Sequence, residues 1–377
     1  MKKKKVLILY ATYGSGHKSV AMSIYNYFLD KKKYDVKVMD IMEYENFVGY
    51  LSKKAFEQNF KHKSSILFSM IYEIFDRKST TIPYKHIVKS LFKNKKLKKE
   101  ICEYNPDLVI TSHFFGGTIV ANYNKKGLIN SKLITILTDY VSHELWIKDV
   151  KRTDAFIVSS DIMKNELVEK GIDKHKIYPY GIPINMQHDN NYDIDSIKKK
   201  YKVLNDKKTI LMFAGGSLGS SFSYTYFKCL LECRYDVNII FVCGKNEELK
   251  SKCERLVKDR EYKNVQILGF SREVDKLLMI SDIVITKPGG LNVTECLEMK
   301  KPMLLIQGNG GQEIYNARFI CRNGYGINCK RVKKLTKTVD RLLTHPNILN
   351  NMYKRLDKYK KNNSIEKVYE LSDKMLR

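Results

Sequence analysis

Short apolar runs alternate with longer helical patterns along the whole chain. Such alternation predicts repeated strand–helix–strand units, which build parallel sheets covered by helices. Five runs in the first half and five in the second have the length and composition of buried strands. They are Val6–Leu9, Val36–Met39, Leu108–Thr111, Leu133–Leu137, Ala155–Ser159, Ile210–Ala214, Asn238–Cys243, Val265–Leu268, Ile283–Ile285 and Met303–Ile306. The pattern therefore predicts an α/β protein with two doubly wound sheets.

A polar stretch separates the two series of strands. It covers residues 185–195 and follows Gly181-Ile182-Pro183-Ile184. A chain of 377 residues is long enough for two domains of ordinary size. We therefore expect an N-terminal domain over residues 1–185 and a C-terminal domain over 186–377. The end of the chain, from about Thr336, is helical and lysine-rich, and its last helix is free to return to the N-terminal domain.

Two glycine loops follow successive strands between Asp282 and Asn316. Lys287-Pro288-Gly289-Gly290 comes first, with Glu295 one helical turn further on. Gly308–Gly311 comes second and leads into Gln312-Glu313. Exposed backbone N–H groups and the positive end of a helix dipole attract an anion at such a place. Carboxylates in the following helical turns suit ribose or sugar hydroxyls, so this stretch predicts a sugar-nucleotide site.

Other strands of the second half also end in turns. Gly215-Gly216-Ser217, Gly244 and Phe270 each follow an apolar run. Singly, these are ordinary turns. Because the carboxyl ends of parallel strands share one edge of the sheet, we expect them to gather beside the two glycine loops. The ring of Phe270 would then lie near a nucleobase.

The first strand of the chain also ends in a glycine loop, which runs from Thr12 through Gly14-Ser15-Gly16 to His17. A histidine over the carboxyl edge of a sheet can act as a general base. The other interpretation is a histidine that caps or packs locally. The adjoining helix N-terminus would lower the pKa of His17, which keeps the imidazole neutral and able to accept a proton.

One segment, from Phe47 to Lys99, breaks the alternation. Residues 49–99 contain 13 Lys and Arg but three acids, a local net charge of 13 − 3 = +10, with aromatic residues interleaved. Basic amphipathic helices with aromatic anchors bind anionic membrane surfaces. The alternative is a set of helices that cover a sheet and expose solvated lysines.

The overall net charge of +27 favours phosphate-rich partners, although a biased composition can produce the same excess. No zinc finger, RNA-recognition motif or recognition helix accompanies it, so we do not expect nucleic-acid binding. The eight cysteines lack metal-ligand spacing, and scattered cysteines suit a reducing compartment. No apolar stretch is long enough to span a membrane, and Val6–Ala11 is too short for a signal peptide. Asp193-Ile194-Asp195 matches a metal-binding D-x-D pattern, but no strand precedes it.

Several motifs in a fixed order resemble one enzyme family over nearly the whole chain. They are Tyr13–His17, Pro106-Asp107 with Thr111-Ser112-His113, Thr138-Asp139-Tyr140-x-x-His143-x-x-Trp146, Gly181-Ile182-Pro183, Lys287–Gly290 with Glu295, and Gly311-Gln312-Glu313 with Asn316. The chain resembles the GT-B glycosyltransferases that transfer sugar to diacylglycerol: bacterial processive diacylglycerol glucosyltransferases and plant monogalactosyldiacylglycerol synthases, in glycosyltransferase family 28. The lipid II–forming N-acetylglucosaminyltransferase is a more distant relative.

The resemblance implies a GT-B fold, with two Rossmann-like domains facing across a cleft. The C-terminal domain would bind a UDP-sugar, with Gly289 and Gly290 by the phosphates, Glu295 on the ribose, and Gln312 and Glu313 on the sugar. The full set of implied nucleotide-sugar contacts is Gly215, Gly216, Ser217, Gly244, Phe270, Lys287, Pro288, Gly289, Gly290, Glu295, Gly311, Gln312, Glu313 and Asn316.

The resemblance also assigns the acceptor side to the N-terminal domain. His17 would be the general base, with Asp139 and His143 as its candidate supports. The implied acceptor contacts are Gly14, Ser15, Gly16, His113, His143 and Trp146. Plant members carry an aspartate in the first loop where this chain has Thr12, which removes one candidate acid and places more of the expected role on His17.

The implied reaction inverts the anomeric carbon and uses no cofactor and no catalytic metal. It moves a hexose, glucose in most bacterial relatives, from the UDP-sugar to diacylglycerol or to glycosyl-diacylglycerol. A galactose donor, or another lipid-linked acceptor, is the alternative that the residues leave open. The implied location is peripheral, on anionic lipids at the cytoplasmic face of a membrane.

Overall fold

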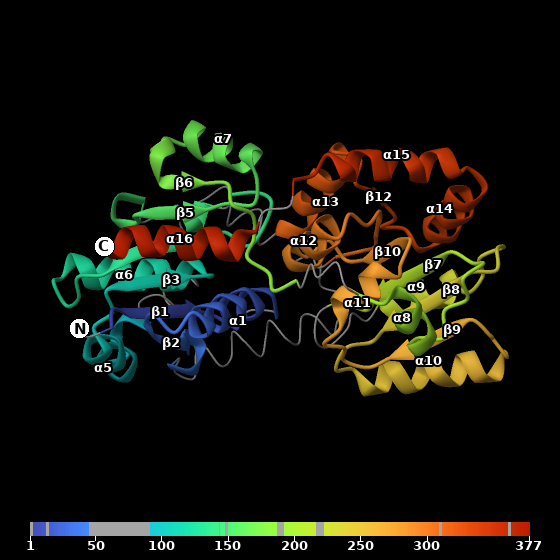
Figure 1. Cartoon of the computed structure of the whole chain (residues 1–377), viewed down its shortest axis with the longest axis horizontal. Coiled ribbons are helices and arrows are strands. Elements are labelled where there is room, and N and C mark those ends of the chain that lie inside the picture. The colour runs from blue at the N-terminus through green and yellow to red at the C-terminus, as the bar shows by residue number, and fades with distance from the viewer. Residues whose placement is uncertain are drawn as a thin grey trace. The chain divides into compact units, whose positions relative to one another are not determined.

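The computed structural model describes residues 3–12, 15–44, 91–142, 144–147, 150–186, 192–215, 222–308, 311–360 and 363–377. The chain forms two compact units, each built on its own sheet (Figure 1). The first unit runs to Asn185 and is completed by Asn362–Arg377, and the second holds Met186–Lys361. The basic aromatic segment expected from Phe47 lies outside the described residues as far as residue 90.

The first unit contains a six-stranded parallel sheet with the order β2-β1-β3-β4-β5-β6. Its strands are β1 (Lys5–Tyr10), β2 (Asp35–Asp40), β3 (Leu108–Thr111), β4 (Lys132–Ile136), β5 (Ala155–Ile157) and β6 (Ile177–Tyr178). Its described helices are α1 (Ser15–Asp30), α5 (Lys95–Tyr104), α6 (Phe114–Lys125) and α7 (Asp161–Glu169), with the 3₁₀ turns η1 (Ile41–Tyr44), η2 (Glu144–Trp146), η3 (Val150–Arg152) and η4 (Lys174–Lys176). The chain winds outward from β1 in one direction and from β3 in the other, so the order reverses between them.

The second unit contains another six-stranded parallel sheet, in the order β12-β11-β10-β7-β8-β9. Its strands are β7 (Thr209–Phe213), β8 (Asn238–Val242), β9 (Val265–Leu268), β10 (Ile283–Thr286), β11 (Met303–Leu305) and β12 (Gly326–Asn328). Its described helices are α8 (Ile194–Lys200), α9 (Ser223–Leu230), α10 (Glu247–Asp259), α11 (Val274–Met279), α12 (Gly290–Glu298), α13 (Gln312–Arg322), α14 (Val332–Thr344) and α15 (Pro346–Asp357). Here the order reverses between β7 and β10.

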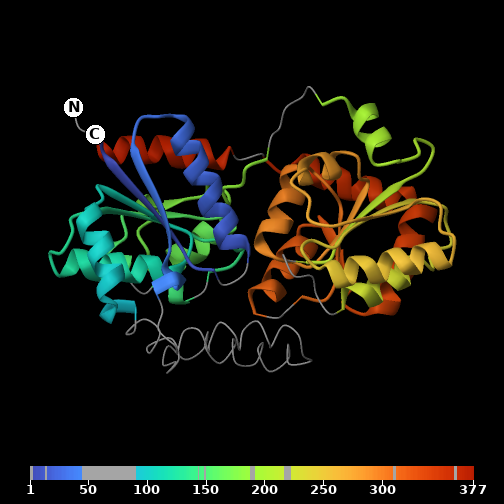
Figure 2. The ribbon, with the colours of Figure 1, turned by 90° about the horizontal axis from the view of Figure 1, so that it is seen from below.

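Continuous apolar runs form the strands because helices cover both faces of each sheet (Figure 2). Every residue of β3, β8 and β10 is buried. The ring of Phe227 on α9 stacks on Phe241 of β8, with centroids 4.7 Å apart. All ten predicted strands are present. The two strands missed by the sequence, β6 and β12, are edge strands of two and three residues, too short to show a pattern.

The last helix, α16 (Ser364–Leu376), packs on α1 in the first unit (Figure 1). The ring of Tyr369 lies 4.9 Å from that of Phe28, between centroids. Asp373 accepts a hydrogen bond of 2.6 Å from the hydroxyl of Tyr34 and forms ion pairs with Lys33 and Arg377. Hydrogen bonds from Lys33, Tyr34 and Arg377 hold the pKa of Asp373 well below its usual range.

The Asp373→Asn substitution should destabilise the first unit by roughly 1–3 kcal/mol at neutral pH, because it removes a carboxylate with three donors. A carboxyl whose pKa is depressed by folding stabilises the fold above its unfolded pKa of about 4 and loses that effect as the pH falls through the folded value. The difference between wild type and variant should therefore vanish in acid. Urea unfolding measures this difference in the free energy of unfolding. The transition can be followed by the fluorescence of Trp146, which is the single tryptophan and belongs to this unit.

The matched control is Asp357→Asn in the second unit, where Asp357 forms an exposed ion pair with Lys300. That change should leave the tryptophan transition in place, because exposed ion pairs contribute little. An Asp373→Asn protein with a wild-type urea midpoint at neutral pH would contradict a stabilising role for this contact.

Candidate functional site

Three strand ends in the first unit meet where the strand order reverses. Leu9 of β1 lies opposite Thr111 of β3, so the loops after these strands leave the sheet at the same level. The loop after β1 leads into α1, whose first turn contains His17, and the loop after β3 ends at His113. Thr138 follows β4, the next strand of the sheet. In open parallel sheets this reversal point, at the carboxyl ends of the strands, is where ligands bind.

His17, in the first turn of α1, is held by the end of β3. Its Nδ1 atom lies 2.6 Å from the carbonyl oxygen of Ser112 and 3.2 Å from Oγ1 of Thr138. A carbonyl oxygen can only accept, so Nδ1 carries the hydrogen and donates it. The hydroxyl of Ser112 in turn donates to the carbonyl oxygen of His17 at 2.8 Å. In the neutral ring this arrangement leaves Nε2 with a free lone pair.

Burial lowers the pKa of His17 to about 4, while the hydrogen bond to the Ser112 carbonyl opposes that shift. The imidazole is therefore neutral near pH 7. A neutral ring that donates through Nδ1 presents Nε2 as a proton acceptor. The surroundings thus prepare His17 to act as a general base.

His113 lies beside His17 and has the opposite tautomer. Its Nδ1 atom accepts the backbone N–H of Phe115 at 3.2 Å and so caps α6, which places the ring hydrogen on Nε2. The two imidazole centroids are 4.6 Å apart. Burial, and then the nearby His17, hold the pKa of His113 well below its ordinary value. The ring of Trp146, from η2, lies 6.2 Å from that of His17.

A carboxylate from a neighbouring strand contacts the first loop, which has Thr12 where plant members of the family have an aspartate. Asp40, at the end of β2, accepts hydrogen bonds from the N–H and the hydroxyl of Thr12 and, at 3.0 Å, from the N–H of Met42. Asp40 is buried. These hydrogen bonds fix the first residue of the loop that leads to His17.

The structure says less about the other residues predicted for the acceptor side. Gly14 and His143 lie outside the described residues, while Ser15 and Gly16 begin α1. Asp139 follows Thr138 and is partly buried. Neither the Ser112 carbonyl nor the Thr138 hydroxyl was singled out as a partner of His17, since only the folded strand order brings them to its ring. The supporting roles of Asp139 and His143 stay predictions.

In the second unit, Lys287 and Glu313 meet at the corresponding reversal point. Lys287 follows β10, and Glu313 lies in the first turn of α13. The Nζ atom of Lys287 is 2.8 Å from Oε1 of Glu313, and the side chains are 17% and 15% exposed. Gly215, which follows β7, contacts the Lys287 side chain. Two of the three charged residues predicted for the donor side, Lys287 and Glu313, therefore form one ion pair.

The two glycine loops of this unit are tied together. The side-chain amide of Asn316 on α13 donates to the carbonyl oxygen of Pro288 at 3.1 Å. Asn292 on α12 donates to Oγ1 of Thr286 at 2.9 Å. Helices α12 and α13 therefore begin side by side, which directs two positive helix ends to one place. Asn316 was predicted as a ligand contact; its side chain is fully buried and positions the first loop.

Three more predicted donor residues lie at this edge of the sheet. Burial, with a smaller effect of Asp275, raises the pKa of Glu295 to about 7. Phe270 follows β9 and is 59% exposed, with the Nζ atom of Lys245 at 5.5 Å from its ring centroid. Gly244 adopts a positive φ of 65° after β8. An exposed ring beside a cation is suited to stacking on a planar heterocycle.

Two of the predicted donor residues are not placed by the structure. Gly216 and Ser217 lie outside the described residues. Asp193 of the D-x-D pattern caps α8, since its carboxylate accepts the N–H of Ser196 at 3.1 Å. Within the described ranges, no group of three or more His, Cys, Asp or Glu residues could hold a metal ion. In the same part of the chain, no helix is both long and apolar enough to cross a membrane.

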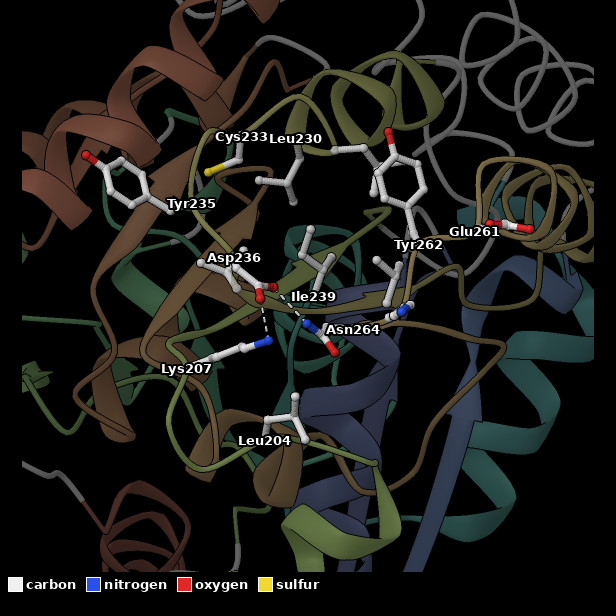
Figure 3. Close-up of a pocket in the computed structure, with 14 residues that line it drawn as sticks. Leu204, Lys207, Leu230, Cys233, Tyr235, Asp236, Ile239, Glu261, Tyr262 and Asn264 are labelled. Atoms are coloured by element: carbon white, nitrogen blue, oxygen red, sulfur yellow. Dashed lines mark hydrogen bonds and ion pairs between the residues drawn. The ribbon is translucent and has the colours of Figure 1, made fainter.

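A cavity of about 530 Å³ lies at the opposite edge of the second sheet, where β7, β8 and β9 begin (Figure 3). Leu230 and Ile239 contribute to its apolar lining. Asp236 is bound there by Lys207 and, at 2.7 Å, by Asn264. None of the predicted donor residues lines this cavity, and its charged pair is already satisfied. It is therefore separate from the candidate site.

Comparisons with known proteins give a match for each of the two units. The family model described as monogalactosyldiacylglycerol synthase matches residues 17–184, and that of the glycosyltransferase family 28 C-terminal domain matches 210–371. A processive diacylglycerol beta-glucosyltransferase of Bacillus licheniformis is 29% identical over 369 residues, covering 96% of this chain and 93% of that protein. Its Bacillus subtilis counterpart is 28% identical over 378 residues, covering 97% and 94%.

The chain belongs to this family of diacylglycerol glycosyltransferases. Two solved structures share the fold at 14% sequence identity: Acinetobacter baumannii MurG, with a TM-score of 0.61 over 98% of this chain and 99% of that one, and S. aureus MnaA with UDP, with 0.63 over 97% and 95%. The predicted α/β, GT-B class is thereby confirmed. The predicted family is confirmed as well.

The hydrogen bonds of this family member predict opposite tautomers for its paired histidines. His17 should carry its hydrogen on Nδ1 and His113 on Nε2. The His17 ring should stay neutral from about pH 8 to about pH 5, because burial lowers its pKa to about 4. Burial also lowers the pKa of His113. Long-range ¹H–¹⁵N spectra of histidine-labelled protein report both properties. The His17→Asn and His113→Asn variants assign the signals. A His17 ring that titrates near about 6.5, the unperturbed value, would refute the assignment.

Proposed function

We propose that this protein transfers a hexose, glucose, from a UDP-sugar to diacylglycerol or to glycosyl-diacylglycerol. The observation that carries the proposal is the neutral His17, whose free Nε2 is available at the carboxyl edge of the first sheet. Proton removal from an alcohol requires such a group. Relatives that match nearly the whole chain are named processive diacylglycerol beta-glucosyltransferases, which supports both the donor and the acceptor.

The donor would bind at the reversal point of the second sheet. The helix ends at Gly290 and Gln312 would stabilise the diphosphate, and Lys287 would supply a positive charge. Glu295 would accept from the ribose hydroxyls, and Phe270 would lie against the uracil ring. These assignments rest on the gathering of these residues at the carboxyl ends of β7, β9, β10 and β11.

The chemistry follows from this placement. The acceptor hydroxyl gives its proton to Nε2 of His17, and its oxygen attacks the anomeric carbon from the face opposite UDP. The bond to the diphosphate breaks, and UDP leaves with the electron pair, so the configuration at that carbon inverts. The resulting imidazolium keeps its Nδ1–H bonds to the carbonyl of Ser112 and the hydroxyl of Thr138. Helix ends and Lys287 take the role that a metal ion has elsewhere.

A galactose donor is the second candidate. It is favoured by the family model over residues 17–184, which is described as monogalactosyldiacylglycerol synthase. Glucose is favoured by the names of relatives that cover both units. Incubation with labelled UDP-glucose or UDP-galactose and diacylglycerol, followed by thin-layer chromatography of the lipids, separates the two. A lipid-linked acceptor is tested in the same assay.

We further propose that the protein binds an anionic membrane surface from the cytoplasmic side. In the described part of the first unit, five lysines of and beside α5 are exposed: Lys93, Lys95, Lys96, Lys98 and Lys99. Leu97 and Ile101 face the core from the same helix, so the lysines project to solvent. Such a cluster attracts anionic lipid headgroups at about 1 kcal/mol per lysine.

The His17→Ala substitution should lower sugar transfer by about 10²–10⁴-fold, because it removes the proton acceptor. Binding of UDP should remain close to that of wild type, since His17 belongs to the acceptor side. Initial rates with UDP-glucose and diacylglycerol, and calorimetry with UDP, measure the two effects. Near-normal turnover would remove His17 from the mechanism.

The Glu295→Ala substitution is the counterpart on the donor side. It should raise the donor KM with a smaller change in kcat, because a ribose contact is made in both ground and transition states. An unchanged donor KM would count against that role of Glu295.

Replacement of Lys95, Lys96, Lys98 and Lys99 by glutamine should weaken binding to phosphatidylglycerol-containing vesicles by at least about tenfold at low salt. In the matched control, glutamine replaces Lys198, Lys199 and Lys200 of α8. Vesicle binding of this control should not change. Retention on duplex DNA over the same salt series tests the nucleic-acid interpretation of the charge. Vesicle binding that is unaffected by the α5 replacements would contradict this surface.

A further inference from the structure

The ion pair between Lys287 and Glu313 occupies the place where an anionic ligand would bind, at the reversal point of the second sheet. Its two residues come from different segments, one after β10 and one at the start of α13. The contact is short, 2.8 Å, and both side chains are largely buried. An ion pair in such surroundings is screened weakly, and its partners lose more when separated than those of a surface pair.

Two glycines leave room for this pair, and a third lies next to it. A Cβ at Gly308 would lie 2.3 Å from Oε2 of Glu313, and one at Gly215 would lie 2.8 Å from Cδ of Lys287. Gly289 approaches both side chains, at 3.6 and 3.8 Å from a would-be Cβ. Gly215 also has a φ of 87°, which disfavours other residues. The loops after β7 and β11 are thus both shaped around this one contact.

The pair also neutralises the site. Two helices begin there, at Gly290 and Gln312, and their N-termini favour an anion. Glu313, in the first turn of α13, is an anion of the protein's own at that position, and Lys287 is its cation. An incoming diphosphate carries the same sign of charge as Glu313, so the two compete for Lys287.

We propose that Lys287 exchanges partners when the donor binds: the diphosphate takes Lys287, and the released Glu313 carboxylate accepts hydrogen bonds from the hydroxyls of the sugar. This inference rests on the proposed function and specifies how the donor site works. A UDP-sugar supplies a new partner for each member of the pair. UDP supplies a new partner for Lys287 alone. It separates Glu313 from Lys287 but has no sugar hydroxyls to offer the carboxylate in exchange. The site therefore discriminates against UDP, which favours release of the product.

Calorimetric titration with UDP and with UDP-glucose tests the exchange. Wild type should bind UDP-glucose more tightly than UDP. Glu313→Gln keeps the shape of the side chain but removes its charge, so it should tighten UDP binding by about tenfold, equivalent to about 1.4 kcal/mol. The preference for UDP-glucose over UDP should fall by at least the same factor. A UDP affinity that is unchanged or weaker in Glu313→Gln would overturn the exchange.

A second background separates partner exchange from simple charge removal. In Lys287→Met, UDP and UDP-glucose should both bind more weakly. Adding Glu313→Gln to Lys287→Met should no longer tighten UDP binding, because no lysine remains to be released. An equal gain in both backgrounds would mean general electrostatics and would also overturn the exchange. The double variant carries no unpaired charge from this pair, which guards against a folding defect.

Asp236→Asn is the matched control, since it removes one charge of the ion pair with Lys207 at the other edge of the same sheet. It should change neither affinity. Failure of the proposed function has a different signature: wild type would bind neither UDP nor UDP-glucose. Equal wild-type affinities for the two ligands would refute the exchange and leave the transferase function standing.

Discussion

The parallel order of the strands is the constraint on which both candidate sites depend. In each sheet the chain winds outward in two directions from a pair of neighbouring strands, β1 and β3 in the first unit and β7 and β10 in the second, so the connections that follow these two strands diverge. Helices cannot cover the sheet edge at that point. The segments that leave there, with His17 in the first turn of α1 in one unit and Lys287 after β10 in the other, are therefore available to a ligand.

Burial has opposite uses in the two units. It keeps His17 neutral, and the carbonyl of Ser112 then determines which nitrogen is free. A base with a pKa of about 4 holds a proton weakly, so in the proposed mechanism the carbonyl and the Thr138 hydroxyl would stabilise the imidazolium during transfer. In the second unit burial strengthens the attraction between Lys287 and Glu313, and any anionic ligand has to compete with it.

Strands and glycine loops were predictable because their signals are local. A run such as Ile283–Thr286 is apolar throughout since helices cover both of its faces, and Gly289 and Gly311 stand where helices begin at a loop. The partners of the predicted residues were not predictable. Asp40 binds Thr12 of the first loop because β2 pairs with β1 in register. The polar side chain of Asn316 was predicted to contact a ligand, yet it is buried and positions the first glycine loop of the second unit.

The sequence by itself determined the fold class, the order of strands and helices along the chain, and the residue types available at each strand end. Periodicity, glycine loops and chain length carry that information within a few residues. The tertiary structure alone decided which side chains meet: the tautomer of His17, the pairing of Lys287 with Glu313, and the return of α16 to the first unit. These contacts join residues far apart in the chain, and only the register and order of the sheets bring such residues within bonding distance.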